Sequence, residues 1–201
     1  MGSISKTIHD YLRTHTEDNI TNESNLACPF SLRRTPKEVG DFDMSNDFSI
    51  VPVKLRFIEN FKDGIPAISR DMDAMKKSIE PIAMVYVVKL LMFLPNMLRH
   101  LIMEDYAAKH TFGFSNVPGP KRQWVTAGAR CQSIGFFMPV GWSLVGSFSI
   151  ISHADVVKMG IGFDKACMSD PQDFINLLMK NLDELLGGAE WRNYGKERGI
   201  K

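Results

Sequence analysis

Residues 110–124 read HTFGFSNVPGPKRQW. The β-prone run 111–114 passes directly into a polar pair, then into a proline, a glycine and a second proline. Each proline has a fixed φ and no backbone N–H, and the glycine between them tolerates conformations that are closed to other residues. The pattern predicts a strand that leaves its sheet along a set path, either at an ordinary turn or beside a site.

The chain downstream of this stretch is typical of strands followed by one helix. From Asp170, a cap residue is followed by Pro171, an apolar stripe and a Gly-Gly stop, which predicts a closing helix. The polar tail 188–201 follows, so we divide the chain into a domain at 1–187 and a tail at 188–201. The expected strands of this half are 111–115, 124–138 (broken by two glycines), 143–152 and 156–163.

Upstream, two strands and two helices are expected. A short helix at 4–13 is followed by a strand at 26–34. The segment 48–57 alternates apolar and basic residues, which predicts a half-buried strand, and Pro52 places it at an edge or a bulge. After a turn at KDGIP (62–66), apolar residues recur at helical spacing from Ile68 to Ile79. Elements in this order predict an α/β fold, a mixed sheet with helices packed on one face.

The segment 82–103, IAMVYVVKLLMFLPNMLRHLIM, is the most apolar in the chain. Three interpretations are open: two helices broken at Pro95 and packed on a sheet, a patch that lies on a lipid surface with its basic side chains at the headgroups, and a transmembrane span. Charged and polar residues inside the segment argue against the span. For a membrane or partner surface, the candidate contacts are Met92, Phe93, Met97 and Arg99.

The composition is that of a soluble globular protein, with 44% hydrophobic and 23% charged residues and a formal net charge of +1. This balance provides no basic surface, so we expect no nucleic-acid partner. Cys28, Cys131 and Cys167 match neither a zinc spacing nor a disulfide framework. We therefore expect small buried thiols in an intracellular, reducing compartment.

A search for catalytic constellations finds little. None of the five histidines has metal-ligand spacing, so no metal is expected. Ser147 and Ser149 share one face of a predicted strand, where they either bind a polar substrate atom or are ordinary hydrogen-bonded sheet residues. His153 and Asp155 flank a predicted hairpin tip. An exposed turn excludes water poorly, so a catalytic dyad there is disfavoured.

As a whole, however, residues 112–187 resemble the C-terminal domain of the wax ester synthase/diacylglycerol acyltransferase family. The resemblance is carried by N-V-P-G-P at 116–120, by A-G-A at 127–129, and by the strand pair and amphipathic helix that follow. Upstream, LACPFSLRR and SNDFSIVPVKL extend it to about residues 4–187. The family has an asparagine on one strand where this sequence has Ser147.

The resemblance implies half of a chloramphenicol acetyltransferase-like two-layer sandwich. In that fold, acyl-CoA and an alcohol meet in a tunnel between two similar halves. The general base is the second histidine of an H-H-x-x-x-D-G motif in the N-terminal half, and we expect this chain to lack that half. No catalytic residue is therefore assigned here. The implied tunnel residues are Ser115, Asn116, Gly119, Ser147, Ser149 and His153.

Three functions follow from the resemblance. The first is an acyltransferase-derived subunit without its own catalytic histidine, a structural or lipid-contacting part of a larger, membrane-associated assembly. The second is the substrate-binding half of a split acyl-CoA:alcohol O-acyltransferase, and the third is an acyl or lipid binding module. No cofactor is required, and acyl-CoA is the expected ligand. We expect a protein partner over the missing half and a peripheral location on an organelle membrane, with a mitochondrial complex among the options.

Overall fold

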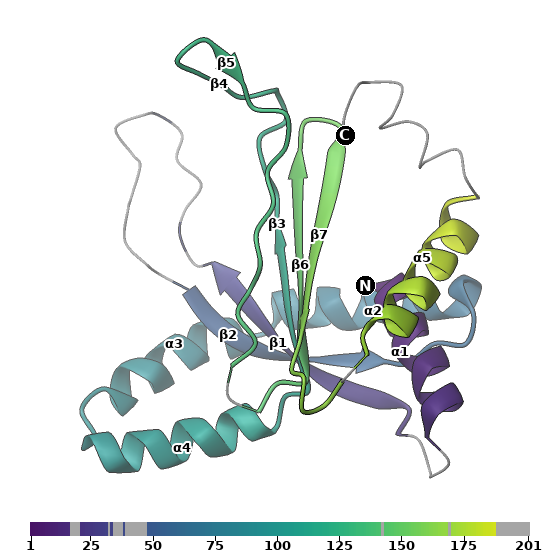
Figure 1. Ribbon diagram of the computed structural model, residues 1–201. Helices are drawn as coiled ribbons and strands as arrows, with labels where there is room; N and C mark the ends of the chain where they lie inside the picture. The colour runs from purple at the N-terminus through teal and green to yellow at the C-terminus, as the bar shows by residue number, and fades with distance from the viewer. Residues whose placement is uncertain are drawn as a thin grey trace.

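The computed structural model describes residues 1–16, 21–31, 33, 38, 48–141, 143–168 and 170–187. The helices in these ranges are α1 (Gly2–His15), α2 (Phe61–Lys77), α3 (Glu80–Leu91), α4 (Asn96–Ala108) and α5 (Gln172–Leu186). The strands are β1 (Glu23–Ser31), β2 (Phe48–Arg56), β3 (Phe112–Val117), β4 (Val125–Thr126), β5 (Ala129–Arg130), β6 (Gly146–His153) and β7 (Val156–Phe163) (Figure 1).

The main sheet has five strands in the order β2-β1-β3-β6-β7. The central strands β1, β3 and β6 are parallel, while the outer strands β2 and β7 pair antiparallel with their neighbours. The predicted mixed sheet is thus confirmed. β2 lies at an edge, as Pro52 indicated, because a residue without an N–H can only leave a ladder bond unmade there at low cost.

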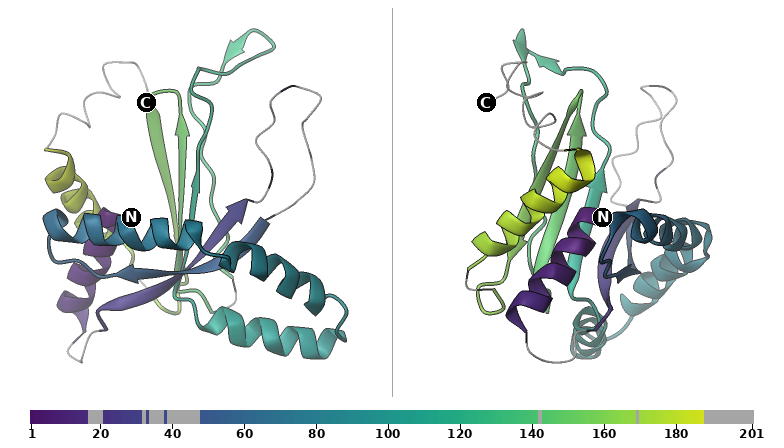
Figure 2. Two further views of the ribbon diagram at one scale, coloured as in Figure 1. Left: turned by 180° about the vertical axis from the view of Figure 1, so that it is seen from behind. Right: turned by 90° about the vertical axis from the view of Figure 1, so that its right-hand side faces the viewer.

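The hydrophobic core lies between one face of the sheet and helices α1, α2 and α5. Figure 2 shows α1 and α5 side by side, and the items of contact between them are polar as well as apolar. Alternating residues of the strands point into this core, while their neighbours point to the opposite face. The fully buried core side chains include Val51, Leu55, Phe148 and Phe174.

A buried asparagine joins α5 to α1. Asn181 is 2% exposed, and its side-chain amide donates to Thr7 Oγ1 (3.0 Å) and to Asp10 Oδ2 (3.1 Å). Partial burial by itself raises the pKa of Asp10, but hydrogen bonds from Lys6, Asn181 and His9 outweigh it. The pKa of Asp10 therefore lies below its ordinary value.

Two helix boundaries differ from the sequence prediction. α2 begins at Phe61, because the side chain of Asn60 accepts a hydrogen bond from the Asp63 N–H (3.1 Å) and caps the helix. KDGIP, predicted as a turn, is consequently the first part of this helix. α5 begins after Pro171, where Asp170 Oδ1 accepts from the Gln172 N–H (3.0 Å), and it ends at Gly187 with a left-handed φ of 80°, as predicted.

The apolar segment forms two helices, α3 and α4, joined by a turn at 92–95, so the break at Pro95 is confirmed. The base of the pair is attached to the sheet: Pro81 and Ala107 are buried, and the Tyr106 hydroxyl donates to the Ile50 carbonyl (3.1 Å). Partial burial raises the pKa of Tyr106. The rest projects away from the sheet, at the opposite end of the molecule from α1 and α5 (Figure 1). Among the described residues, no helix has the length and apolarity that crossing a membrane requires.

The predicted strand at 124–138 is wrong. Only the short β4–β5 hairpin forms there, and residues 131–141 follow it without joining the sheet. The reason is that the positions beside β3 and β7 offer no ladder to this segment: β3 is already paired on both sides, by β1 and β6. The segment lies instead over one face of the sheet.

The cysteines differ in exposure. Cys28 is buried, and burial raises the pKa of its thiol to about 12. Cys131 is half-buried and Cys167 is exposed, so the expectation of three buried thiols holds for one of them. Cys167 is exposed because it lies in the turn between β7 and α5 rather than on a strand. The predicted polar tail at 188–201 lies outside the described residues.

Candidate functional site

The crossover 116–120 is fixed to the end of β6 by hydrogen bonds. The Gly119 N–H donates to Ser152 Oγ (3.1 Å), and the Ala154 N–H donates to the Pro120 carbonyl (2.8 Å). A Cβ on Gly119 would lie 1.7 Å from the Ser152 carbonyl oxygen, so only glycine fits. The N-V-P-G-P sequence thus holds the chain directly against the β6–β7 turn.

The sequence-predicted tunnel residues lie on β3, its crossover and β6. Ser115 and Ser149 are paired in the parallel register, and Gly119 contacts the strand end beside His153. Asn116 lies on the opposite face from Ser115, because successive strand residues alternate, and it is exposed. The carboxyl ends of parallel strands are the usual place for ligands in α/β sheets.

Both strand serines hold the main chain of Met138. The Ser147 hydroxyl donates to the Met138 carbonyl (2.7 Å), and Ser149 Oγ accepts from the Met138 N–H (2.8 Å). Each serine is 1% exposed. We call residues 131–141 the strap; it runs beside β3 from β5 towards β6 (Figure 1). In this arrangement the two hydroxyls bind protein backbone rather than facing open solvent.

Glycines allow the strap to lie this close to the sheet. A Cβ on Gly160 would lie 2.5 Å from the Phe136 carbonyl oxygen, and one on Gly113 would lie 2.2 Å from the end of the Met138 side chain. On the same face, Lys158 Nζ donates to Ser133 Oγ (2.7 Å). The strap therefore occupies the sheet face opposite the helices, over small residues of β3, β6 and β7.

His153 is buried, with 3% of its surface exposed, although the sequence placed it at an exposed hairpin tip. The crossover explains the difference, since it is bonded to the neighbours on both sides, Ser152 and Ala154. Within the described part of the chain, His153 Nε2 is buried and has no hydrogen-bond partner. Nothing in the sequence pattern signalled that burial, because the crossover that covers this end of β6 belongs to a distant segment.

The membrane or partner candidates lie at the turn between α3 and α4. Phe93, Met97 and Met92 are 86%, 79% and 64% exposed. Arg99 contacts Asn96 Oδ1 and approaches Met92 Sδ at 3.8 Å. These four residues are close to one another and far from the crossover, so they form a separate surface.

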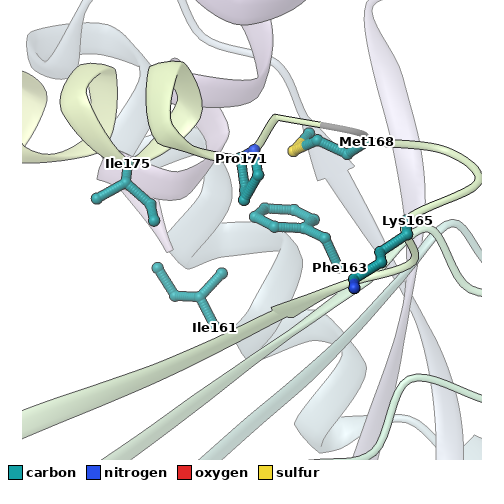
Figure 3. A pocket seen from close by; sticks show the side chains of 6 residues that line it. All are labelled: Ile161, Phe163, Lys165, Met168, Pro171 and Ile175. Carbon is teal, nitrogen blue, oxygen red and sulfur yellow. The ribbon is translucent and has the colours of Figure 1, made fainter.

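A small groove of about 200 Å³ lies between β7 and the start of α5. Figure 3 shows the ring of Phe163 between Pro171 and Ile161, with Lys165 at the side. The lining is mainly apolar, and it is completed by Met168 and Ile175. None of the tunnel candidates lines this groove, which sequence reasoning did not identify.

Comparison with known proteins assigns the class. Residues 44–186 match the family model of the WS/DGAT C-terminal domain, and the chain belongs to that family. No curated protein matches the chain significantly.

Solved structures agree on the fold. The chain is similar to the wax ester synthase/diacylglycerol acyltransferase from Marinobacter aquaeolei VT8, with 18% identity and a TM-score of 0.58 over 92% of this chain and 41% of that one. The expected acyltransferase-like fold is thereby confirmed, and the chain spans well under half the length of this relative. A weaker similarity, with 11% identity and a TM-score of 0.48, covers 91% of this chain and 40% of the epimerization domain from the third module of tyrocidine synthetase B.

Proposed function

We propose that this chain is an acyltransferase-derived subunit without a catalytic histidine of its own, which acts as a structural and lipid-contacting component of a larger, membrane-associated assembly. A protein partner would cover the side where an acyltransferase has its second half. The location would be intracellular and peripheral to a membrane. Acyl-CoA would be a ligand of the assembly, with no further cofactor required.

The observation that carries this proposal is the use of Ser147 and Ser149. Hydroxyls at these positions would have to face substrate in a working tunnel, but here both hold the backbone of Met138. A hydroxyl that binds a main-chain group at 2.7–2.8 Å stabilises the fold and is not free for an acyl substrate. The sequence also contains no adjacent pair of histidines, the element that supplies the general base in the family it resembles.

One observation favours an alternative, the substrate-binding half of a split acyl-CoA:alcohol O-acyltransferase of the wax ester or diacylglycerol type. His153 has a buried ring nitrogen without a partner, beside the crossover that contains Gly119. A buried polar group without a hydrogen bond is costly, and a substrate or partner group could supply that bond.

An acyl-transfer assay tests the proposal. The purified chain is mixed with a long-chain acyl-CoA and a long-chain alcohol in detergent micelles, and release of CoA is measured. We expect no release above that of a heat-denatured sample. Calorimetry on the same sample measures whether acyl-CoA binds without being turned over. Transfer by the chain alone would overturn the proposal.

A second mixture separates the two functions. The N-terminal half of a wax ester synthase, which carries H-H-x-x-x-D-G, is added as a separate chain. Under the proposal, the mixture transfers no more acyl groups than that half alone. Transfer that needs both chains, and that falls in His153→Ala, would instead establish the split enzyme.

A further inference from the structure

The apolar hairpin, which we define as residues 79–102 of α3, its turn and α4, exposes an unusually large hydrophobic surface. Soluble monomers rarely expose large contiguous apolar patches, and such patches mark interaction sites. Phe93 is 86% exposed, and the side chains of Ile79 and Met97 are nearly as open. The exposed large hydrophobic residues are Ile79, Ile82, Tyr86, Val87, Val88, Leu90, Met92, Phe93, Met97, Leu98, Leu101 and Ile102.

The exposed side chains surround α3 rather than forming one stripe. With 3.6 residues per turn, positions 82, 86, 87, 88 and 90 cover roughly two thirds of the helix circumference. A helix that packs against one protein surface needs only a single apolar stripe, whereas a helix that is apolar nearly all round needs apolar surroundings on most sides. Lipid provides such surroundings, and a flat protein surface does not.

Charges in the hairpin are separated along its length. The cationic side chains Lys89 and Arg99 lie about one helical turn behind the tip, one on each helix, with His100 next to Arg99. The acidic residues Glu80, Glu104 and Asp105 lie at the base, near the sheet. The part of the hairpin nearest the tip is therefore positive, which complements the anionic headgroups of a membrane surface.

The backbone of the turn is suited to an apolar environment. The N–H groups of Met92, Phe93 and Leu94 all donate to carbonyls of α3, at 3.0–3.2 Å. A segment can enter lipid only if its backbone groups are satisfied internally. By contrast, the first turn of α4 has no side-chain cap, so its N–H groups need water or headgroup oxygens. These two features together limit insertion to a shallow depth.

We propose that the hairpin tip, residues 90–98, inserts into one leaflet of an anionic membrane, to the depth at which Lys89 and Arg99 meet the lipid phosphates. Since these residues lie about 4.5 Å behind the turn along the helix axis, only the tip enters the acyl region, as interfacial helices do at about 5–10 Å. Tyr86, whose ring lies 5.9 Å from Lys89 Nζ, is then at headgroup level, where tyrosine is favoured. The inference rests on the lipid-contact part of the proposed function and names its surface.

Vesicle co-sedimentation of the full chain tests the charge requirement. We expect binding to phosphatidylcholine vesicles that contain phosphatidylserine and much weaker binding to phosphatidylcholine alone. Lys89→Gln and Arg99→Gln should each lower affinity about fivefold. Phe93→Asp and Met97→Asp should each lower it by at least about tenfold. Phe137→Asp is the matched control, an exposed phenylalanine on the strap (75%), and it should bind as the wild type does.

Depth is measured with Phe93→Trp. Its fluorescence should shift to the blue on binding, and lipids brominated near the headgroup end of the acyl chain should quench it more than lipids brominated near the methyl end. Stronger quenching from the methyl end would overturn the shallow insertion. Equal thermal unfolding of all variants establishes that each change acts at the surface.

Other outcomes overturn the inference without affecting the acyl-transfer assay. Vesicle binding that is unchanged in Phe93→Asp would place the lipid contact elsewhere. If the chain ignores vesicles but forms dimers that Phe93→Asp dissociates, as seen by sedimentation, the hairpin is a protein interface. Conversely, acyl transfer by the chain alone would refute the proposed function and leave hairpin-dependent vesicle binding intact.

Discussion

Gly119 lies where the chain leaves β3 and meets the end of β6. The contact between its α-carbon and the Ser152 carbonyl is a main-chain contact on both sides, so neither partner can rotate away from an added methyl group. Gly113 and Gly160 have the same role beneath the strap. At this scale, small residues determine how closely distant segments approach.

Gly119→Ala is expected to lower the free energy of unfolding by about 3 kcal/mol or more, because its Cβ would lie 1.7 Å from a backbone oxygen. Urea unfolding followed by circular dichroism measures the change. Gly141→Ala is the matched control, since no atom lies within 4 Å of its Cβ and it should cost less than about 0.5 kcal/mol. Similar losses in the two variants would contradict the contact.

Cys28 should be the least reactive of the three cysteines. Burial raises the pKa of its thiol to about 12, so its thiolate fraction at pH ~8 is about 1000-fold below that of an ordinary thiol. Alkylation by iodoacetamide, followed by mass spectrometry of the labelled peptides, should modify Cys167 first and Cys28 last. Labelling of Cys28 at the rate of Cys167 in the folded chain would show that the thiol is not buried.

At the scale of elements, polar groups join helices that are far apart in the sequence. α1 and α5 are in contact through Asn181, and that one amide binds both Thr7 and Asp10. The strap is held to β6 in the same way, by Ser147 and Ser149. Such buried hydrogen bonds specify which surfaces pair, because a mispaired polar group would lose its partner.

The α1–α5 contact should make stability depend on pH in acid. Since the pKa of Asp10 is lower in the folded chain than its ordinary value near 3.8, its contribution is complete above that value and is lost as the pH falls through the folded pKa. Urea unfolding at pH values from neutral down to about 3 should show this loss. Asp10→Asn should flatten the dependence in that range, and Asn181→Ala should reduce it in part, because Lys6 and His9 remain. An unchanged slope in Asp10→Asn would assign the acid sensitivity to other groups.

At the scale of the whole molecule, the fold has a well-packed end and an unpacked one. Around Phe174, aromatic rings from α1, β6, β7 and α5 meet, with centroids 5.0–6.0 Å apart. The apolar hairpin at the other end has comparable hydrophobicity but remains exposed. The stability of the isolated chain therefore depends on the first end, and its interactions depend on the second.

Phe174→Ala should remove much of that stability. A fully buried phenylalanine costs about 3–5 kcal/mol when truncated, against a total of about 5–15 kcal/mol for a domain. We expect a lower urea midpoint and weaker near-ultraviolet circular dichroism. Leu186→Ala, on the same helix but 52% exposed, is the control and should change little. Equal effects would mean that α5 does not dock through Phe174.

Local patterns were sufficient for most elements. The alternation in 48–57 and 156–163, the proline at position 52 and the cap and Gly stop of α5 each depend on neighbours within a few residues, so they can be recognised without the fold. The start of α2 was missed because Asn60 lies in a segment that also matches a turn. The family resemblance, carried by the order of short motifs, predicted the fold class that the structural comparison confirmed.

The tertiary structure alone decided the surroundings of the candidate site. Whether 124–138 forms a strand depends on which sheet edges remain unpaired, and whether Ser147, Ser149 and His153 are open depends on segments distant in the sequence. The same holds for 82–103, whose apolar residues are equally compatible with a core and with a surface. Composition and periodicity determine what each segment can form, whereas burial is a property of the contacts between segments.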